Sequence, residues 1–165
     1  MNSYIIRTAE ATDLPTIMQL VASAKAIMRK SGNTNQWNDG YPSEDIIMED
    51  IKSGSCHIIM NGDTAVGSFV LKPGPNPTYS KIYGGQWLDD KPYYVIHRIT
   101  SREDAHGIFG EMLQYCFSIS HNIRIDTHND NVIMRHLLEK NGFKYCGIIH
   151  IANGDERLAY QKTTN

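Results

Sequence analysis

Residues 93–113 combine the features of a strand, a polar turn and the start of a helix. Tyr93–Thr100 is rich in β-branched and aromatic residues, which favour a strand. After Gly107, apolar residues recur at Phe109 and at the third, fourth and seventh positions after it, as on one face of a helix. The first N–H groups of a helix lack partners and carry partial positive charge. The stretch therefore predicts an anion-binding site where the turn enters the helix.

The same turn has a simpler interpretation, because a glycine between a strand and a helix often only lets the chain turn. The turn is not a P-loop, since no Gly-Lys-Ser/Thr closes it. It is not a dinucleotide-binding turn either, since that needs G-x-G-x-x-G. The anion site therefore depends on support from the rest of the chain.

Neither the histidines nor the cysteines predict a metal site. The seven histidines form no HExxH motif and have no Cys-x-x-Cys partner. Cys56, Cys116 and Cys146 are odd in number and widely spaced, which is typical of reduced thiols in a cytoplasmic protein. The opening MNSYIIRTAEATD lacks the apolar core of a signal peptide, so we expect a cytoplasmic location.

Length and composition predict one globular domain, residues 1–165, with a full hydrophobic core. Hydrophobic residues make up 41% and charged residues 21% of the chain, an ordinary balance for a globular protein. The net charge is −2 with no basic run, so we expect no nucleic-acid partner. No apolar stretch approaches about 18 residues, so we expect no membrane partner.

The order of predicted elements begins with a strand at 4–7 and a helix to about residue 29. A helix capped by Ser43, a hairpin turning at Asn61-Gly62 and the central strand–turn–helix follow. A strand at 122–127, a helix at 131–140 and a terminal hairpin complete the chain. An antiparallel first half and a β-α-β-α second half predict a mixed sheet covered by helices.

Taken in order, these elements resemble the GNAT superfamily of acyl-CoA-dependent N-acetyltransferases. The opening YIIRTAEATDLPTIMQL is similar to the family's first strand and helix. GIFGEML, residues 107–113, is similar to the start of its cofactor helix, and NVIMRHLLEKNGF, residues 131–143, to its Asn-led helix ending in Gly-Phe. The resemblance covers essentially the whole chain. It implies a GNAT-like α/β fold (an α+β mixed sheet) in the order β-α-α-β-β-β-α-β-α-β-β.

The resemblance implies acetyl-CoA as cosubstrate, without a metal. The pantetheine arm would enter a splay between the strands at 93–100 and 122–127, where backbone groups would bond its amides and the thioester oxygen. Amides of the turn would hold the pyrophosphate. The implied cofactor-binding residues are Ile99, Thr100, Ser101, Ala105, His106, Gly107, Ile108, Phe109, Gly110 and Asn131.

The acceptor implied by the resemblance is a primary amine of a small molecule or peptide, attacking the thioester directly in a ternary complex. Two irregular loops, 30–41 and 72–91, would line its site, through Trp37, Tyr41, Tyr83 and Trp87. Aromatic and acidic side chains suit a cationic amine. The alternative is that these rings only anchor the loops to the core. Family members are often dimers, so a homodimer would fit the resemblance.

Two departures from the family pattern concern binding and catalysis. Asp104 and Phe109 stand where the phosphate loop usually carries Arg or Gln and a small residue. The Asp removes a favourable charge and the Phe takes the place of a small residue, but backbone N–H donors do not depend on side-chain identity, so coenzyme binding can survive. Leu138 stands where many members carry the Tyr that protonates the leaving thiolate. We expect Tyr145, Cys146 or water to take that role.

The general base has several candidates: His97, His128 and the Asp89/Asp90 pair. Histidine titrates near neutrality, and His97 lies on the strand next to the thioester, although a hydrogen-bonded core histidine is the more common interpretation of such a residue. Strand alternation predicts that His97 and its neighbour Arg98 point to opposite faces. Arg98 and Asp126, on neighbouring strands, are predicted to form an ion pair.

The function predicted from these residues is N-acetylation of an amine by acetyl-CoA. One alternative is a catalytically weakened, CoA-binding sensor domain of the same fold, which Asp104, Phe109 and Leu138 favour. Another is an unrelated α/β enzyme or binding protein. Thiol release from acetyl-CoA over a panel of amines separates the first two hypotheses.

Overall fold

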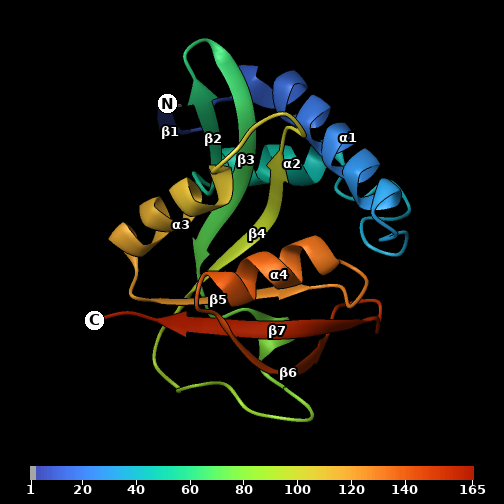
Figure 1. Cartoon of the computed structure of the whole chain (residues 1–165), viewed down its shortest axis with the longest axis vertical. Coiled ribbons are helices and arrows are strands. Elements are labelled where there is room, and N and C mark those ends of the chain that lie inside the picture. Colours follow the sequence, from blue (N-terminus) through green and yellow to red (C-terminus); the bar gives the residue numbers. More distant parts are fainter. Residues whose placement is uncertain (1–2) are drawn as a thin grey trace.

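The structure, a computed structural model, describes residues 3–165, in which seven strands form one mixed sheet in the order β1-β2-β3-β4-β5-β7-β6 (Figure 1). Only the β4–β5 pair within this part of the chain is parallel. The strands are β1 (Tyr4–Thr8), β2 (Cys56–Asn61), β3 (Thr64–Pro73), β4 (Tyr94–Ser101), β5 (Asn122–Thr127), β6 (Lys144–His150) and β7 (Glu156–Thr163). The helices are α1 (Leu14–Lys30), α2 (Glu44–Lys52), α3 (Ile108–Ile119) and α4 (Val132–Lys140), with 3-10 turns at Ala11–Asp13 and Pro77–Tyr79.

Helices cover both faces of the sheet (Figure 1). Ile58 on β2 belongs to a core cluster with the apolar faces of α1 and α2. Its neighbour Ile59 belongs to a second cluster with α3 and α4, because successive strand side chains point to opposite faces. The predicted element order and the mixed α/β sheet are therefore confirmed.

Local sequence signals set several element boundaries. The Ser43 hydroxyl accepts a hydrogen bond from the Ile46 N–H at 3.3 Å and caps α2 as predicted. The Asn131 side chain accepts one from the Met134 N–H at 3.0 Å and caps α4. Gly62, with φ 62°, makes the predicted tight turn between β2 and β3.

The feature that creates the site is the separation of β4 from β5. Their parallel ladder contains two pairs of residues, Tyr94–Ile123 and Val95–Arg124, and the described strands do not pair beyond them. The splay predicted between these strands is therefore present. Beyond Val95, the edge of β4 that faces β5 is left for other partners.

A bulge in β4 lies beside this opening. Ser68 pairs with Thr100 and Val70 with His97, so the β3–β4 register shifts, and Arg98 has φ 50°. A positive φ is costly for a long side chain and persists only where surrounding contacts hold it. Here Asp50 on α2 holds the Arg98 guanidinium through two hydrogen bonds of 2.7 and 2.8 Å.

The structure contradicts two predictions made for His97 and Arg98 on β4. Arg98 pairs with Asp50 and not with Asp126, which instead accepts a hydrogen bond from the Tyr79 hydroxyl at 2.6 Å. His97 and Arg98 both line one cavity, because the bulge interrupts strand alternation. Within residues 3–165, every helix is too short or too polar to span a bilayer, and no three metal-ligating side chains cluster.

Candidate functional site

Two adjoining cavities lie where β4 and β5 part. The larger has a volume of about 590 Å³ and the smaller about 110 Å³. Four residues line both: Met28, Ile99, Asn131 and Met134. The strands therefore open a cleft with two compartments, one on each side of these shared residues.

The smaller cavity is mostly apolar and is lined by α1, the end of β4, α3 and α4. Five of the predicted cofactor residues line it: Ile99, Ser101, Ile108, Phe109 and Asn131. Phe109 also packs against the main core. Its ring is thus accommodated beside the cleft. Thr100 does not line the cavity, because its side chain is buried and bonds the Ser68 hydroxyl at 2.6 Å and its backbone pairs with β3.

The start of α3 has the free donors that an anion site requires. Gly107, with φ 75°, is the N-cap and supplies no side-chain cap. The first backbone bond runs from the Glu111 N–H to the Gly107 carbonyl at 3.2 Å. The described residues give no acceptor to the N–H groups of Ile108, Phe109 and Gly110, which carry the positive end of the helix dipole. Ala105 differs, since its N–H already donates to the Arg102 carbonyl at 3.2 Å.

The acidic side chains of this turn are matched by basic partners. Arg102 lies 3.2 Å from Asp104, and Lys30 at the end of α1 lies 3.1 Å from Glu103. Both pairs are exposed, so each contributes little to stability. Their effect is on the local charge, because the negative charge of Asp104 stands beside the guanidinium of Arg102.

The larger cavity is the more polar of the two and is built mainly from loops. It is lined by the α1–α2 loop, the β3–β4 loop, the β6–β7 loop and the facing parts of β4 and β5. Two of the predicted substrate-binding residues, Trp37 and Tyr41, line it. Trp37 is 8% exposed and also packs in the α1–α2 core, so it both anchors the loop and faces the cavity.

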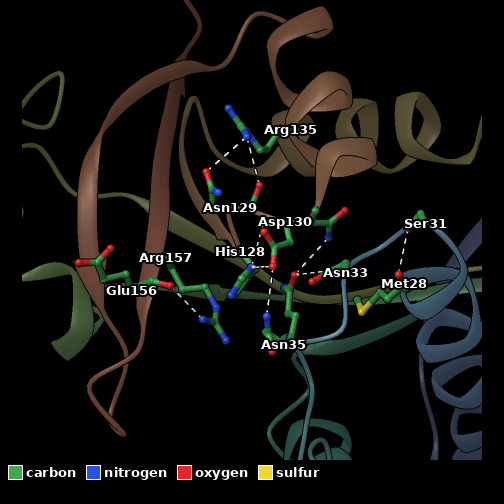
Figure 2. Close-up of polar contacts among 12 residues, drawn as sticks. Met28, Ser31, Asn33, Asn35, His128, Asn129, Asp130, Arg135, Glu156 and Arg157 are labelled. Carbon is green, nitrogen blue, oxygen red and sulfur yellow. Dashed lines mark hydrogen bonds and ion pairs between the residues drawn. The ribbon is translucent and has the colours of Figure 1, made fainter.

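The α1–α2 loop is held in place over the cleft by specific bonds. The Arg29 guanidinium donates to the carbonyl oxygens of Asn33, Gln36 and Trp37 at 3.1, 2.9 and 3.2 Å. From the loop, Asn35 donates to Asp130 at 3.2 Å, beside the start of α4 (Figure 2). These contacts link α1 and the α1–α2 loop to the start of α4 beside the larger cavity. Arg29 is a functional candidate that the sequence did not single out.

Tyr83 was predicted to bind substrate, and the structure places it elsewhere. Its backbone pairs with Ile148 in both directions at 2.8 Å, and its half-exposed ring packs on His150. The close approach depends on Gly85, where a Cβ atom would lie 2.0 Å from the Cys146 carbonyl oxygen. The segment that carries Tyr83 is thus fixed against β6, outside both cavities.

Trp87 was also predicted to bind substrate, and the structure holds it against Arg124 and Tyr79. Its ring faces the Arg124 guanidinium, whose carbon lies 4.1 Å from the ring centre, and its N–H donates to the Tyr79 carbonyl at 3.0 Å. Trp87 lines neither cavity. Its role is to pin the β3–β4 loop to β5 through a cation–π contact.

His97 lines the larger cavity but is poorly suited to act as a base. Burial, helped by the charges of Arg98 and Lys72, lowers the pKa of His97 to about 3. Its Nε2 lies 3.1 Å from the Asn76 amide nitrogen, and the Asn76 oxygen already accepts from Thr78, so Nε2 accepts this bond. His97 is therefore a neutral, hydrogen-bonded residue of the cavity wall at neutral pH.

Asp126 is the functional candidate that sequence reasoning misassigned. It lies on β5 and lines the larger cavity with His97. Burial raises the pKa of Asp126 above its usual value, although the Tyr79 hydroxyl and the charge of Arg157 oppose this effect. A carboxylate of raised pKa is a stronger base, and a negative charge attracts an ammonium group. The feature of the sequence that indicated Asp126 was an acidic residue interrupting the apolar pattern of the predicted strand 122–127.

The other proton-transfer candidates lie outside the two cavities. Tyr145 is 51% exposed on β6 and packs on Tyr160, while Cys146 is buried and lies 3.4 Å from the Lys144 carbonyl oxygen. Leu138 is fully buried in the main core. Tyr145, Cys146 and Leu138 line neither cavity, and the same holds for His128, Asp89 and Asp90. The structure therefore places Tyr145, the predicted catalytic residue, outside both cavities, with its ring against Tyr160.

Comparison with known proteins gives the same fold. No family model matches the sequence, and no curated protein matches it. A GNAT-family acetyltransferase from Streptococcus agalactiae has a TM-score of 0.90 and 33% sequence identity, over 98% of this chain and 96% of that chain. One from Listeria monocytogenes has a TM-score of 0.70 and 21% identity, over 98% and 95%. The PaiA N-acetyltransferase from Thermoplasma acidophilum, solved with coenzyme A, has a TM-score of 0.68 and 14% identity, over 98% and 99%.

Proposed function

The chain belongs to the GNAT family of acetyltransferases, and we propose that it transfers an acetyl group from acetyl-CoA to the primary amine of a small molecule or peptide. The observation that carries this proposal is the two-compartment cleft at the splay of β4 and β5. An apolar compartment beside free helix N–H groups suits a thioester donor. A polar compartment with a buried carboxylate suits an amine acceptor.

The donor side fits coenzyme A by the chemistry of its groups. The free N–H groups at the start of α3 suit a pyrophosphate. The smaller cavity, with the unpaired edge of β4, suits the pantetheine arm, whose amides need backbone partners. The coenzyme A complex of the Thermoplasma protein supports this proposal through the shared fold.

The acceptor side would supply the base. Bound acetyl-CoA would provide an activated thioester carbonyl. Asp126 would attract the ammonium form of the acceptor and accept its proton, which frees the nitrogen lone pair for attack. Over the reaction a C–N bond forms, the C–S bond breaks, and coenzyme A leaves as a thiol. His97 and Asn76 would orient the acceptor as neutral hydrogen-bonding groups.

No described side chain takes the place of a thiol-protonating tyrosine, so we propose that water delivers the proton to sulfur. Leu138 lies in the core and Tyr145 on an outer strand. Asn131 lines both cavities, and although its amide donates to Gln36 at 3.2 Å, a second amide hydrogen remains that would contact the leaving sulfur or the pantetheine arm.

The test is a calorimetric titration with acetyl-CoA and with CoA, followed by thiol release over a panel of amines. Micromolar binding and amine-dependent thiol release are the expected results. Binding without thiol release for any amine would favour the CoA-binding sensor domain. Absence of binding would contradict the assignment of the donor side.

A further inference from the structure

Arg157, at the start of β7, is a buried arginine whose charge the surrounding side chains do not match. It is 7% exposed and lines the larger cavity. Among the described residues it makes one hydrogen bond, from Nη1 to the Glu156 carbonyl oxygen at 3.0 Å, and no carboxylate lies within ion-pair distance. Figure 2 shows its side chain extending from β7 towards the space between Asn35 and His128.

The other two arginines on the strands around the cleft are differently placed. Arg98 is fully engaged, since Asp50 binds its Nε and Nη2 and the Tyr41 hydroxyl binds its Nη1. Arg124 is held between the rings of Trp87 and Tyr93, with its carbon 4.1 and 4.0 Å from the ring centres. Of these three, Arg157 alone lines the larger cavity without a carboxylate or aromatic partner among the described residues, and its Nε and Nη2 make no hydrogen bond there. Burying a charge without a partner costs folding free energy. Such a charge has a use where a bound ligand supplies the opposite charge.

Arg157 and Asp126 share one face of the sheet. In the antiparallel β5–β7 ladder Asp126 pairs with Ala159, and Arg157 stands two residues before Ala159. Such diagonal neighbours on one face are about 7 Å apart. They are farther apart than an ion pair, yet near enough for the Arg157 charge to lower the pKa of Asp126. A cation and an anion thus face one cavity with space for a small molecule between them.

The two charged groups match the two ends of a small zwitterion. A planar guanidinium binds a carboxylate through two parallel hydrogen bonds. A phosphate dianion would call for more positive charge than one arginine supplies, and a diamine would bring a second cation against Arg157.

We infer that the acceptor is a free amino acid, whose carboxylate is bound by Arg157 while its ammonium group faces Asp126. This inference rests on the proposed N-acetyltransferase function and names the class of its acceptor. The volume of the larger cavity, about 590 Å³, is sufficient for such a ligand. The carboxylate then selects amino acids over the corresponding simple amines.

The experiment compares each amino acid with the amine that lacks its carboxylate: phenylalanine with 2-phenylethylamine, lysine with 1,5-diaminopentane, and alanine with ethylamine. Each compound is titrated calorimetrically into the full chain saturated with CoA, so binding is measured without turnover. Thiol release with acetyl-CoA gives kcat and KM for the same compounds. We expect the amino acid to bind about 10- to 100-fold more tightly than its amine in at least one pair.

Substitution identifies the group that selects the carboxylate. Arg157→Gln should abolish the preference, mainly through a higher KM for the amino acid, and Arg157→Lys should restore part of it. Arg7→Gln is the matched control, because Arg7 pairs with Asp13 and lines neither cavity, and it should keep the preference. If the Gln variant does not fold, the Lys variant carries the test.

The outcomes separate this inference from the proposed function. Equal or weaker binding of the amino acid in every pair, no binding of any compound, or a preference unchanged in both Arg157 variants overturns the amino-acid assignment. Amine acetylation without a carboxylate preference overturns it while supporting the proposed function. Arg157-dependent binding of amino acids without thiol release supports the amino-acid site and overturns the proposed function.

Discussion

The two compartments of the cleft are lined by different kinds of chemical group. The smaller is formed by apolar side chains and by backbone groups at the start of α3 and along β4. The larger holds most of the polar and charged side chains of the cleft, which come mainly from three loops and from β4, β5 and β7. Backbone groups persist when side chains change, so the donor side tolerates departures such as Asp104 and Phe109. The acceptor side depends on the identity and position of each side chain, and there a single substitution should matter more.

The largest expected effect is on the acceptor side. Asp126→Asn should lower kcat by about 10²- to 10⁴-fold, because it removes the proposed base while keeping a hydrogen-bond acceptor for Tyr79. The wild-type rate should rise with pH through the raised pKa of Asp126, and the variant should lack this step. Asp90→Asn, outside both cavities, is the control. A variant that keeps the wild-type rate would exclude Asp126 as the base.

The same substitution should raise stability. Because burial raises the pKa of Asp126 in the folded state, the protonated form is favoured on folding. Its contribution to stability is therefore greatest at low pH and is lost as pH rises through the raised pKa. Asp126→Asn removes that loss, so its free energy of unfolding in urea at pH 7 should exceed that of the wild type. A lower value would mean that the Tyr79 and Arg157 interactions outweigh the cost of burial.

The donor side can be tested by a substitution beside the backbone N–H groups at the start of α3. Space beside Gly110 is open, since a Cβ atom there would have no neighbour within 4 Å. Gly110→Glu should weaken CoA binding by about 10- to 100-fold, because it places a negative charge in the first turn that should hold the pyrophosphate. A glutamate in the first turn of a helix is favourable for folding, so stability should be kept. Gly110→Ala is the control, and equal CoA affinity in all three proteins would move the pyrophosphate elsewhere.

A smaller effect should distinguish the binding of the acceptor from the binding of CoA. Arg29→Gln removes the donor that holds three carbonyl groups of the α1–α2 loop. We expect a loss of about 1–3 kcal/mol in stability and a several-fold rise in KM for the acceptor. The affinity for CoA, measured by calorimetry, should change less. An equal loss of both affinities would mean that the loop supports the whole cleft.

The smallest effect concerns His97. Its pKa of about 3 in the folded state lies below its usual value, so the unfolded chain binds a proton that the folded chain does not. Stability should therefore fall as pH decreases from about 6.5, by at most about 2 kcal/mol at pH 5. His97→Asn should reduce this fall in urea titrations at the two pH values. The rate profile above pH 5 should not report His97, and a step lost only in this variant would restore it as the base.

The sequence by itself determined the order of elements and the position of the anion turn. Ser43, Asn61-Gly62 and the Asn131–Phe143 motif act on neighbouring residues, so their structural effects are local and predictable. The apolar periodicities likewise assign each helix and strand. These signals account for the confirmed fold and for the donor residues that line the smaller cavity.

Only the tertiary structure decided the acceptor side. Arg98 pairs with Asp50, 48 residues away, and a bulge in β4 brings His97 and Arg98 to one cavity against the alternation of the strand. Tyr83 and Trp87, chosen because they are aromatic residues in a loop, are fixed by contacts with β6 and β5 instead. Asp126 on β5 and Arg157 on β7 line one cavity because these two strands, which α4 and β6 separate in the sequence, pair in the sheet. Charge pairing, strand register and burial are long-range properties, and they set both which side chains face the cavity and how readily they take up a proton.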